Sequence, residues 1–145
     1  MINTNELRLG NIILYNKRPV VVKGIFENVV ELDGIGRVLS DDQGLEPIML
    51  SNTLFDLINV GRKPDSYGMS RTYHGGLFVI RGDENDGYFI SMTVGDSEPI
   101  HITPCLIRCF HQLQNIHFAQ YGCEISIREQ QVIMAWQTIQ NFKKV

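Results

Sequence analysis

The cysteines and histidines are the residues of this chain whose types and spacing most directly suggest chemistry. Cys105 and Cys109 lie one turn apart in a predicted helix, so their thiols would point the same way. A structural zinc site usually has a second closely spaced pair, and the sequence has none. We therefore expect no metal, and we interpret Cys105, Cys109 and Cys123 as free thiols of a reducing compartment.

Cys105 also lies near the start of that predicted helix, with His101 just upstream. A helix start lowers the pKa of a thiol and a nearby histidine can act as a base, so the pair has two parts of a cysteine nucleophile. No third group that would orient the histidine can be identified. We favour a packed cysteine over a catalytic one, and we expect neither catalysis nor a cofactor.

The polar face of the same predicted helix is the candidate binding site. His111 and Asn115 lie one turn apart, and Arg108 lies on the same side, so that several hydrogen-bond donors would face a ligand or partner. The alternative is an ordinary solvated helix face. Gln114 lies near apolar neighbours, where it would bind the candidate ligand or satisfy backbone groups of an adjacent strand.

A second candidate surface is basic. Lys17, Arg18 and Lys23 lie close together in a predicted β-rich segment, next to aromatic residues, as in many nucleic-acid-binding barrels. The same lysines and arginines would also be normal at solvated hairpin tips. Residues 1–64 contain 7 basic and 8 acidic side chains, which does not favour a phosphate backbone as the partner.

Residues 11–39 are predicted to form four short strands. We expect them at residues 11–15, 20–25, 29–32 and 35–39. The breaks between them contain Asn16-Lys17-Arg18-Pro19, Glu27-Asn28 and Asp33-Gly34, all of which favour tight turns. Four short strands joined in this way predict a strongly twisted sheet or an SH3-like barrel.

The middle of the chain is predicted to contain a short helix followed by more strands. A strand-like segment at residues 47–50 leads to Ser51, a good N-cap, and the helix is expected to end at Gly61. Further strands are expected at residues 77–81, 88–94 and 100–102. Alternation in the second of them predicts a core face that comprises Tyr88, Ile90, Met92 and Val94.

Two helices are predicted near the C-terminus. The first is expected to begin at Thr103-Pro104 and to end at Gly122, with His117 in the middle of its apolar arc as a core histidine. A short strand at residues 123–127 precedes the second helix, at about residues 128–142. The wide apolar stripe of that helix predicts burial on two sides or an oligomer contact.

These elements predict an α+β fold with an N-terminal β-meander or SH3-like small barrel, followed by an antiparallel sheet packed with two C-terminal helices. We expect a β-rich N-terminal lobe at residues 1–50 and an α+β C-terminal lobe at residues 51–145. The two lobes are expected to form one cooperative unit.

Composition excludes several classes of protein. The 145 residues include 43% hydrophobic residues, and 13 basic against 16 acidic side chains give a net charge of −3, which is typical of a globular domain rather than a disordered chain. No apolar run approaches the ~18 residues of a membrane span. The N-terminal residues do not resemble a signal peptide, so a cytoplasmic location is expected.

Three segments, in this order and spacing, resemble one family. They are Glu6-Leu7-Arg8-Leu9-Gly10-Asn11, Leu45-Glu46-Pro47-Ile48-Met49-Leu50-Ser51 and His111-Gln112-Leu113-Gln114-Asn115. The family comprises small proteins of unknown function encoded in prophages and mobile elements of gut anaerobic bacteria. The resemblance implies a β-rich N-terminal part, a proline segment before a short helix, and a viral or mobile-element origin, but no activity.

The sequence therefore favours a non-catalytic protein-interaction module that binds a protein partner or itself through Arg108, His111, Gln114 and Asn115. The alternative is a nucleic-acid-binding accessory protein that uses Lys17, Arg18 and Lys23.

Overall fold

The chain divides into two compact units. The computed structural model describes residues 2–58, 61–64, 71–75, 78–92, 100–101, 106–125 and 129–144. Unit 1 comprises Met1–Ile48 and Cys109–Gly122, and unit 2 comprises Met49–Arg108 and Cys123–Val145. The predicted α+β class is confirmed, with a curled antiparallel sheet in the N-terminal part and two C-terminal helices.

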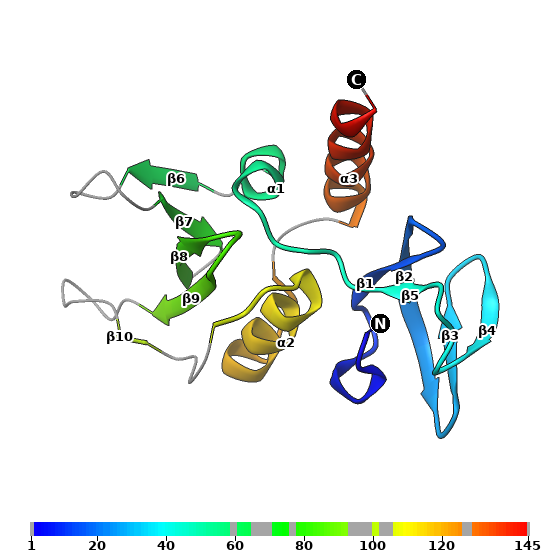
Figure 1. The fold of residues 1–145 in the computed structure, drawn as a ribbon. Coiled ribbons are helices and arrows are strands. Elements are labelled where there is room, and N and C mark those ends of the chain that lie inside the picture. The colour runs from blue at the N-terminus through cyan, green and yellow to red at the C-terminus, as the bar shows by residue number, and fades with distance from the viewer. Residues whose placement is uncertain are drawn as a thin grey trace. The chain divides into compact units, whose positions relative to one another are not determined.

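Unit 1 contains a five-stranded antiparallel sheet that curls into a half-barrel (Figure 1). A short 3-10 turn, η1 (Thr4–Glu6), precedes it. The strands are β1 (Ile12–Tyr15), β2 (Arg18–Phe26), β3 (Val29–Leu32), β4 (Gly36–Leu39) and β5 (Leu45–Glu46), in the spatial order β4-β3-β2-β1-β5. The four strands predicted within residues 11–39 are confirmed, whereas the strand expected at residues 47–50 lies earlier, at β5.

Local sequence explains the curl of this sheet. Asn16 and Lys17 form the two-residue turn between β1 and β2 with φ angles of 48° and 66°, the left-handed conformation that matches the twist of paired strands. β2 is long enough to pair with β1 through its first half and with β3 through its second. The register shifts between Val22 and Gly24, and such a bulge bends the strand. The apolar core of the half-barrel includes Ile13, Val22, Val30, Leu32 and Leu45.

Helix α2 (Phe110–Tyr121) completes unit 1 and packs against β1. It ends at Gly122, whose φ of 67° is the left-handed terminating conformation, as predicted. The predicted start at Thr103-Pro104 is wrong. The N-cap is Cys109, and Ile107 instead forms an antiparallel bridge with Tyr88, which holds this stretch extended. Thr103 and Pro104 themselves lie outside the described residues.

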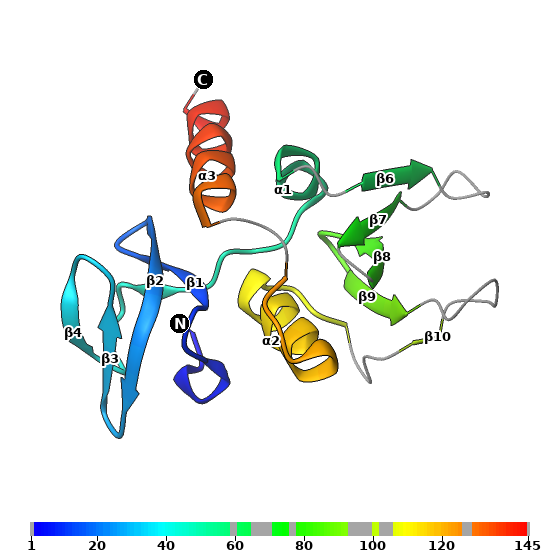
Figure 2. The same cartoon turned by 180° about the vertical axis from the view of Figure 1, so that it is seen from behind.

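Unit 2 contains a second five-stranded antiparallel sheet, in the order β10-β9-β8-β7-β6 (Figure 2). Its strands are β6 (Gly61–Pro64), β7 (Arg71–Gly75), β8 (Phe78–Asp83), β9 (Gly87–Met92) and β10 (Ile100–His101). The sequence did not predict β6 or β7. Tyr88 and Ile90 are fully buried, which confirms the predicted core face of β9 at these two positions. Val94 and the side chain of Met92 lie outside the described part of the chain.

Two helices accompany this sheet in unit 2 and lie side by side in both views, α1 (Asn52–Leu57) and α3 (Glu129–Lys143) (Figures 1 and 2). Ser51 caps α1 as predicted, since its Oγ accepts a hydrogen bond from the Leu54 N–H at 3.0 Å. The helix ends after Leu57, before the predicted Gly61. α3 buries Val132 and Ala135.

The segment between α2 and α3 differs from the prediction. Residues 123–125 form no strand, and the rest of the predicted strand at residues 123–127 lies outside the described residues. Among the helices that the structure describes, none has the length and apolar character needed to cross a membrane.

Candidate functional site

The predicted binding helix uses its polar side chains inside unit 1. Gln114 is almost completely buried, and its side-chain Oε1 accepts a hydrogen bond from the Ile12 N–H at 2.9 Å. Its Nε2 donates to the Gly10 carbonyl at 3.1 Å. The prediction that Gln114 satisfies backbone groups of an adjacent strand is therefore confirmed, because both ends of its amide pair with the chain that enters β1.

Asn115 extends this network toward the N-terminus. Its Nδ2 donates to the Glu6 carbonyl at 2.6 Å, and its Oδ1 accepts from the Asn11 Nδ2 at 2.9 Å. Asn11 is fully buried, and its Oδ1 accepts from the Arg8 N–H at 2.7 Å. Sequence reasoning did not single out Asn11, although a polar residue directly before an apolar strand is the kind of signal that would have identified it.

His111 is buried where α2 meets the N-terminal chain around Glu6. Only 2% of its side chain is exposed, and Nε2 lies 3.7 Å from the Glu6 Oε2. Neither ring nitrogen has a hydrogen-bond partner among the described residues. Burial lowers the pKa of His111 below its usual value, because removing the ring from water disfavours the charged form, and the nearby Glu6 carboxylate opposes this only in part.

The alternative of a solvated polar face is therefore wrong at His111. Its ring is buried beside Glu6, and the helical pattern alone could not place that segment there. His117, predicted as a core histidine, is buried. Whether His111, Gln114 and Asn115 also bind a partner stays a prediction.

Arg108 does not belong to this cluster. It lies in unit 2, where it is exposed and its Nη1 donates to the Asn85 carbonyl at 3.0 Å. His111, Gln114 and Asn115 are thus brought together within unit 1. Arg108 instead makes its hydrogen bond within unit 2.

The three predicted basic residues are all exposed on unit 1. Lys17 lies 2.5 Å from the Glu46 carboxylate, so that part of its charge is neutralised. Unit 1 carries 5 basic and 7 acidic side chains in residues 1–48 and none in residues 109–122, so its formal charge is 5 − 7 = −2 with histidines neutral. Unit 1 as a whole is therefore negatively charged, despite its exposed basic residues.

An apolar surface on the outside of the half-barrel was not predicted. Phe26 pairs with Val29 across β2 and β3, and Val29 pairs with Leu39 across β3 and β4, so the three side chains form a row on one face. Phe26 and Leu39 are 49% and 60% exposed. On the same face, the next paired residues are Glu31 and Arg37. We call these five residues the outer face.

The charged pair of the outer face borders its apolar row. The Arg37 guanidinium lies 4.8 Å from the centre of the Phe26 ring, and its Nε lies 3.7 Å from the Glu31 carboxylate. β4 is an edge strand of the sheet, so a row of apolar side chains reaches an edge that could accept another strand.

The predicted chemistry of the cysteines is only partly covered by the structure. Neither Cys109 nor Cys123 forms a disulfide bond. Cys105 and the side chain of His101 lie outside the described residues. Among the residues that are described, no group of three or more potential ligands is placed to hold a metal ion.

Comparison with known proteins adds no relative: no family model, no curated protein and no solved structure matches this chain.

Proposed function

We propose that this chain is a non-catalytic protein-interaction module of a prophage or mobile element, that it acts in the cytoplasm, and that the outer face of unit 1 binds its partner. The observation that carries the proposal is the exposed apolar row of Phe26, Val29 and Leu39 at the edge of a sheet. The resemblance of the three sequence segments to mobile-element proteins supports the origin. Cys109 and Cys123 form no disulfide bond, which agrees with a reducing compartment.

The chemistry of the outer face favours a protein partner. Natural sheets usually protect an edge with charges or bulges, whereas the edge strand β4 carries the exposed Leu39 beside its one charged residue, Arg37. A partner strand that pairs with β4 gains backbone hydrogen bonds and buries Leu39 against its own apolar residues, and further apolar residues of the partner cover Phe26 on the same face. Arg37 and Glu31 supply a polar rim, as in many protein interfaces.

The polar network under α2 supports the same proposal. Gln114 and Asn115 form hydrogen bonds to the chain that enters β1, so this network holds the start of the half-barrel sheet against α2. A rigid scaffold lowers the conformational entropy that the module itself loses when it binds a partner.

Affinity capture with matched variants tests the proposal. The double variant Phe26→Ser/Leu39→Ser removes the apolar row, and Met134→Ser removes a similarly exposed apolar side chain from α3 in unit 2. Captures from the host lysate are made with nuclease and at high salt, and circular dichroism checks that each variant is folded.

We expect the wild-type protein and Met134→Ser to retain the same protein partner, and the double variant to lose it by about tenfold or more, since two central apolar contacts together contribute more than about 1.4 kcal/mol. A partner that all three proteins retain equally would place the binding site elsewhere. Capture of no protein would contradict the proposed function.

The alternative function is nucleic-acid binding through Lys17, Arg18 and Lys23. The exposure of these side chains favours it, and the negative formal charge of unit 1 opposes it. Fluorescence anisotropy with short RNA and DNA is the test. Binding that weakens steeply with salt, and that Arg18→Gln/Lys23→Gln abolishes, would support this alternative.

A further inference from the structure

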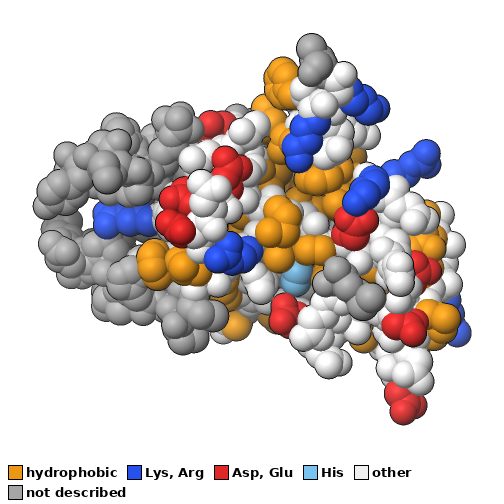
Figure 3. Space-filling view, in the orientation of Figure 1, with side chains coloured by type: hydrophobic (Ala, Val, Ile, Leu, Met, Phe, Trp, Pro, Cys, Tyr) orange, Lys and Arg blue, Asp and Glu red, His pale blue; other side chains and the backbone are white. Residues whose placement is uncertain are grey.

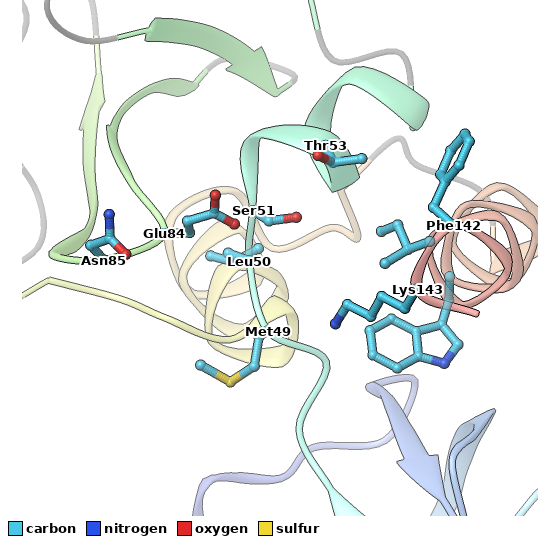
Figure 4. Close-up of a pocket in the computed structure, with 10 residues that line it drawn as sticks. Met49, Leu50, Ser51, Thr53, Glu84, Asn85, Phe142 and Lys143 are labelled. Carbon is cyan, nitrogen blue, oxygen red and sulfur yellow. The ribbon is translucent and has the colours of Figure 1, made fainter. Parts of the chain in front are cut away.

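Unit 2 contains a cavity that the proposed function does not use. Its volume is about 720 Å³, within the range of small-molecule sites. Three parts of unit 2 form its walls: the segment that leads into α1, the turn between β8 and β9, and the last turns of α3 (Figure 4). The lining residues are Met49, Leu50, Ser51, Thr53, Glu84, Asn85, Trp136, Ile139, Phe142 and Lys143.

The apolar lining comes mainly from α3. Trp136, Ile139 and Phe142 occur at intervals of three residues on this helix. Met49 and Leu50 lie across the cavity from Phe142 (Figure 4). The space-filling view shows hydrophobic side chains beside those of Lys or Arg over α3 (Figure 3). This wall suits a ring or a branched hydrocarbon, because an indole offers a flat apolar surface for stacking.

The polar lining has an unequal distribution of charge. Lys143 extends from α3 toward the segment that contains Met49 (Figure 4). Glu84 belongs to the β8–β9 turn, which is held by hydrogen bonds from the Asn85 and Asp86 N–H groups to the Asp83 Oδ1 at 2.8 Å. An anion would therefore be attracted at the α3 side of the cavity and repelled at the turn.

Ser51 adds a hydrogen-bond donor near the middle. Its Oγ accepts from the Leu54 N–H as the cap of α1, and this leaves the hydroxyl hydrogen to donate. We propose that the cavity binds a small monocarboxylic acid with an aromatic or branched apolar body, with the body against Trp136 and Ile139 and the carboxylate at Lys143. The end of the ligand near Glu84 is uncharged or carries a donor.

The chain provides its own reporter for this proposal. Trp136 is the only tryptophan of the sequence and lines the cavity, so intrinsic fluorescence reports on this site. The probes are phenylpropanoate, phenylpropanamide and phenylpropylamine, which share a ring and differ in the charge of the head group. The variants are Lys143→Gln and, as a matched control, Lys144→Gln at the next position, which does not line the cavity.

We expect saturable changes in Trp136 fluorescence with phenylpropanoate, and about three- to fivefold tighter binding of the carboxylate than of the amide, the gain typical of a partly exposed ion pair. Lys143→Gln should remove this preference without weakening amide binding, and Lys144→Gln should leave it unchanged. The proposal is overturned by a change that does not saturate, by tighter binding of the amine, or by a preference that survives in Lys143→Gln.

Discussion

At the level of single residues, a substitution of Gln114 tests how α2 is attached to the half-barrel. Replacing it with methionine keeps the length of the side chain and leaves the Ile12 N–H and the Gly10 carbonyl without their partner. Since each buried unpaired group costs about 1–3 kcal/mol, we expect Gln114→Met to lower the free energy of unfolding by about 2–4 kcal/mol. Urea unfolding followed by circular dichroism measures this.

The matched control is Gln120→Met, on the exposed side of the same helix. We expect it to change the free energy of unfolding by less than about 0.5 kcal/mol. Equal effects of the two substitutions would show that the Gln114 hydrogen bonds do not hold α2 in place.

His111 predicts a pH dependence of stability. Its pKa is lowered in the folded chain by burial, so the unfolded chain binds more protons once the pH falls below the usual value of about 6.5. The stability contributed by the neutral, buried ring is therefore fully present above about pH 6.5. It is lost as the pH falls toward the folded pKa, with a slope of at most about 1.4 kcal/mol per pH unit.

Two variants check the source of this slope. His111→Phe removes the titrating ring and should flatten the stability profile between about pH 6.5 and 5. Glu6→Gln removes the carboxylate that raises the pKa of His111, and should extend the loss to lower pH. A profile for His111→Phe that matches the wild-type profile in this window would contradict the assignment.

Residue types predicted the environment of a side chain correctly where that environment depends on nearby residues. They predicted it wrongly where a segment distant in sequence covers the side chain. The pairing of Gln114 with a strand followed from a polar residue among apolar neighbours. The burial of His111 did not, because the chain around Glu6 that covers it is more than a hundred residues away in sequence. A helical wheel describes which residues share a face, but not what lies against that face.

At the scale of elements, the end of α2 offers a direct test. Gly122 has a φ of 67°. Apart from its chain neighbours and the backbone of its own helix, no atom of the described residues lies within 4 Å of the position that a Cβ would take, so the cost of a side chain there is conformational rather than steric. We expect Gly122→Ala to destabilise the protein by about 1 kcal/mol and Gly122→Asn by less, since asparagine tolerates the left-handed region. Thermal unfolding of the three proteins checks the order.

If Gly122→Ala is as stable as the wild type, the helix does not end in the left-handed conformation in solution.

The elements that the sequence predicted are those with strong local signals. The hairpin at Asn16, the Ser51 cap and the Gly122 stop each depend on one or two residues, and all three are present. The start of α2 was missed because Ile107 pairs with Tyr88 in a distant strand, which overrides the helix signal of Thr103-Pro104. β6 and β7 lack the alternating apolar pattern by which strands are identified.

At the scale of the whole molecule, unit 1 is built from two distant parts of the chain. Residues 1–48 form the half-barrel, and Cys109–Gly122 supplies α2 after the long excursion through unit 2. A fragment of residues 1–50, the lobe expected from the sequence, lacks α2 and the partners of Asn11, Ile12 and Gly10.

We therefore expect the fragment of residues 1–50 to show no cooperative thermal transition alone. A synthetic peptide of residues 109–122 should restore ordered structure when it is added, detected by amide dispersion in NMR spectra. A fragment that unfolds cooperatively without the peptide would show that α2 is not required for the half-barrel.

Site-specific photo-cross-linking measures directly whether the outer face of unit 1 contacts a protein. A photoreactive phenylalanine analogue replaces Leu39 in one protein and Met134 in another, both at exposed positions. In nuclease-treated host lysate, we expect the probe at position 39 to form a covalent adduct with one defined protein and the probe at position 134 to form none. An adduct at position 134 alone, or none at position 39, would contradict this expectation.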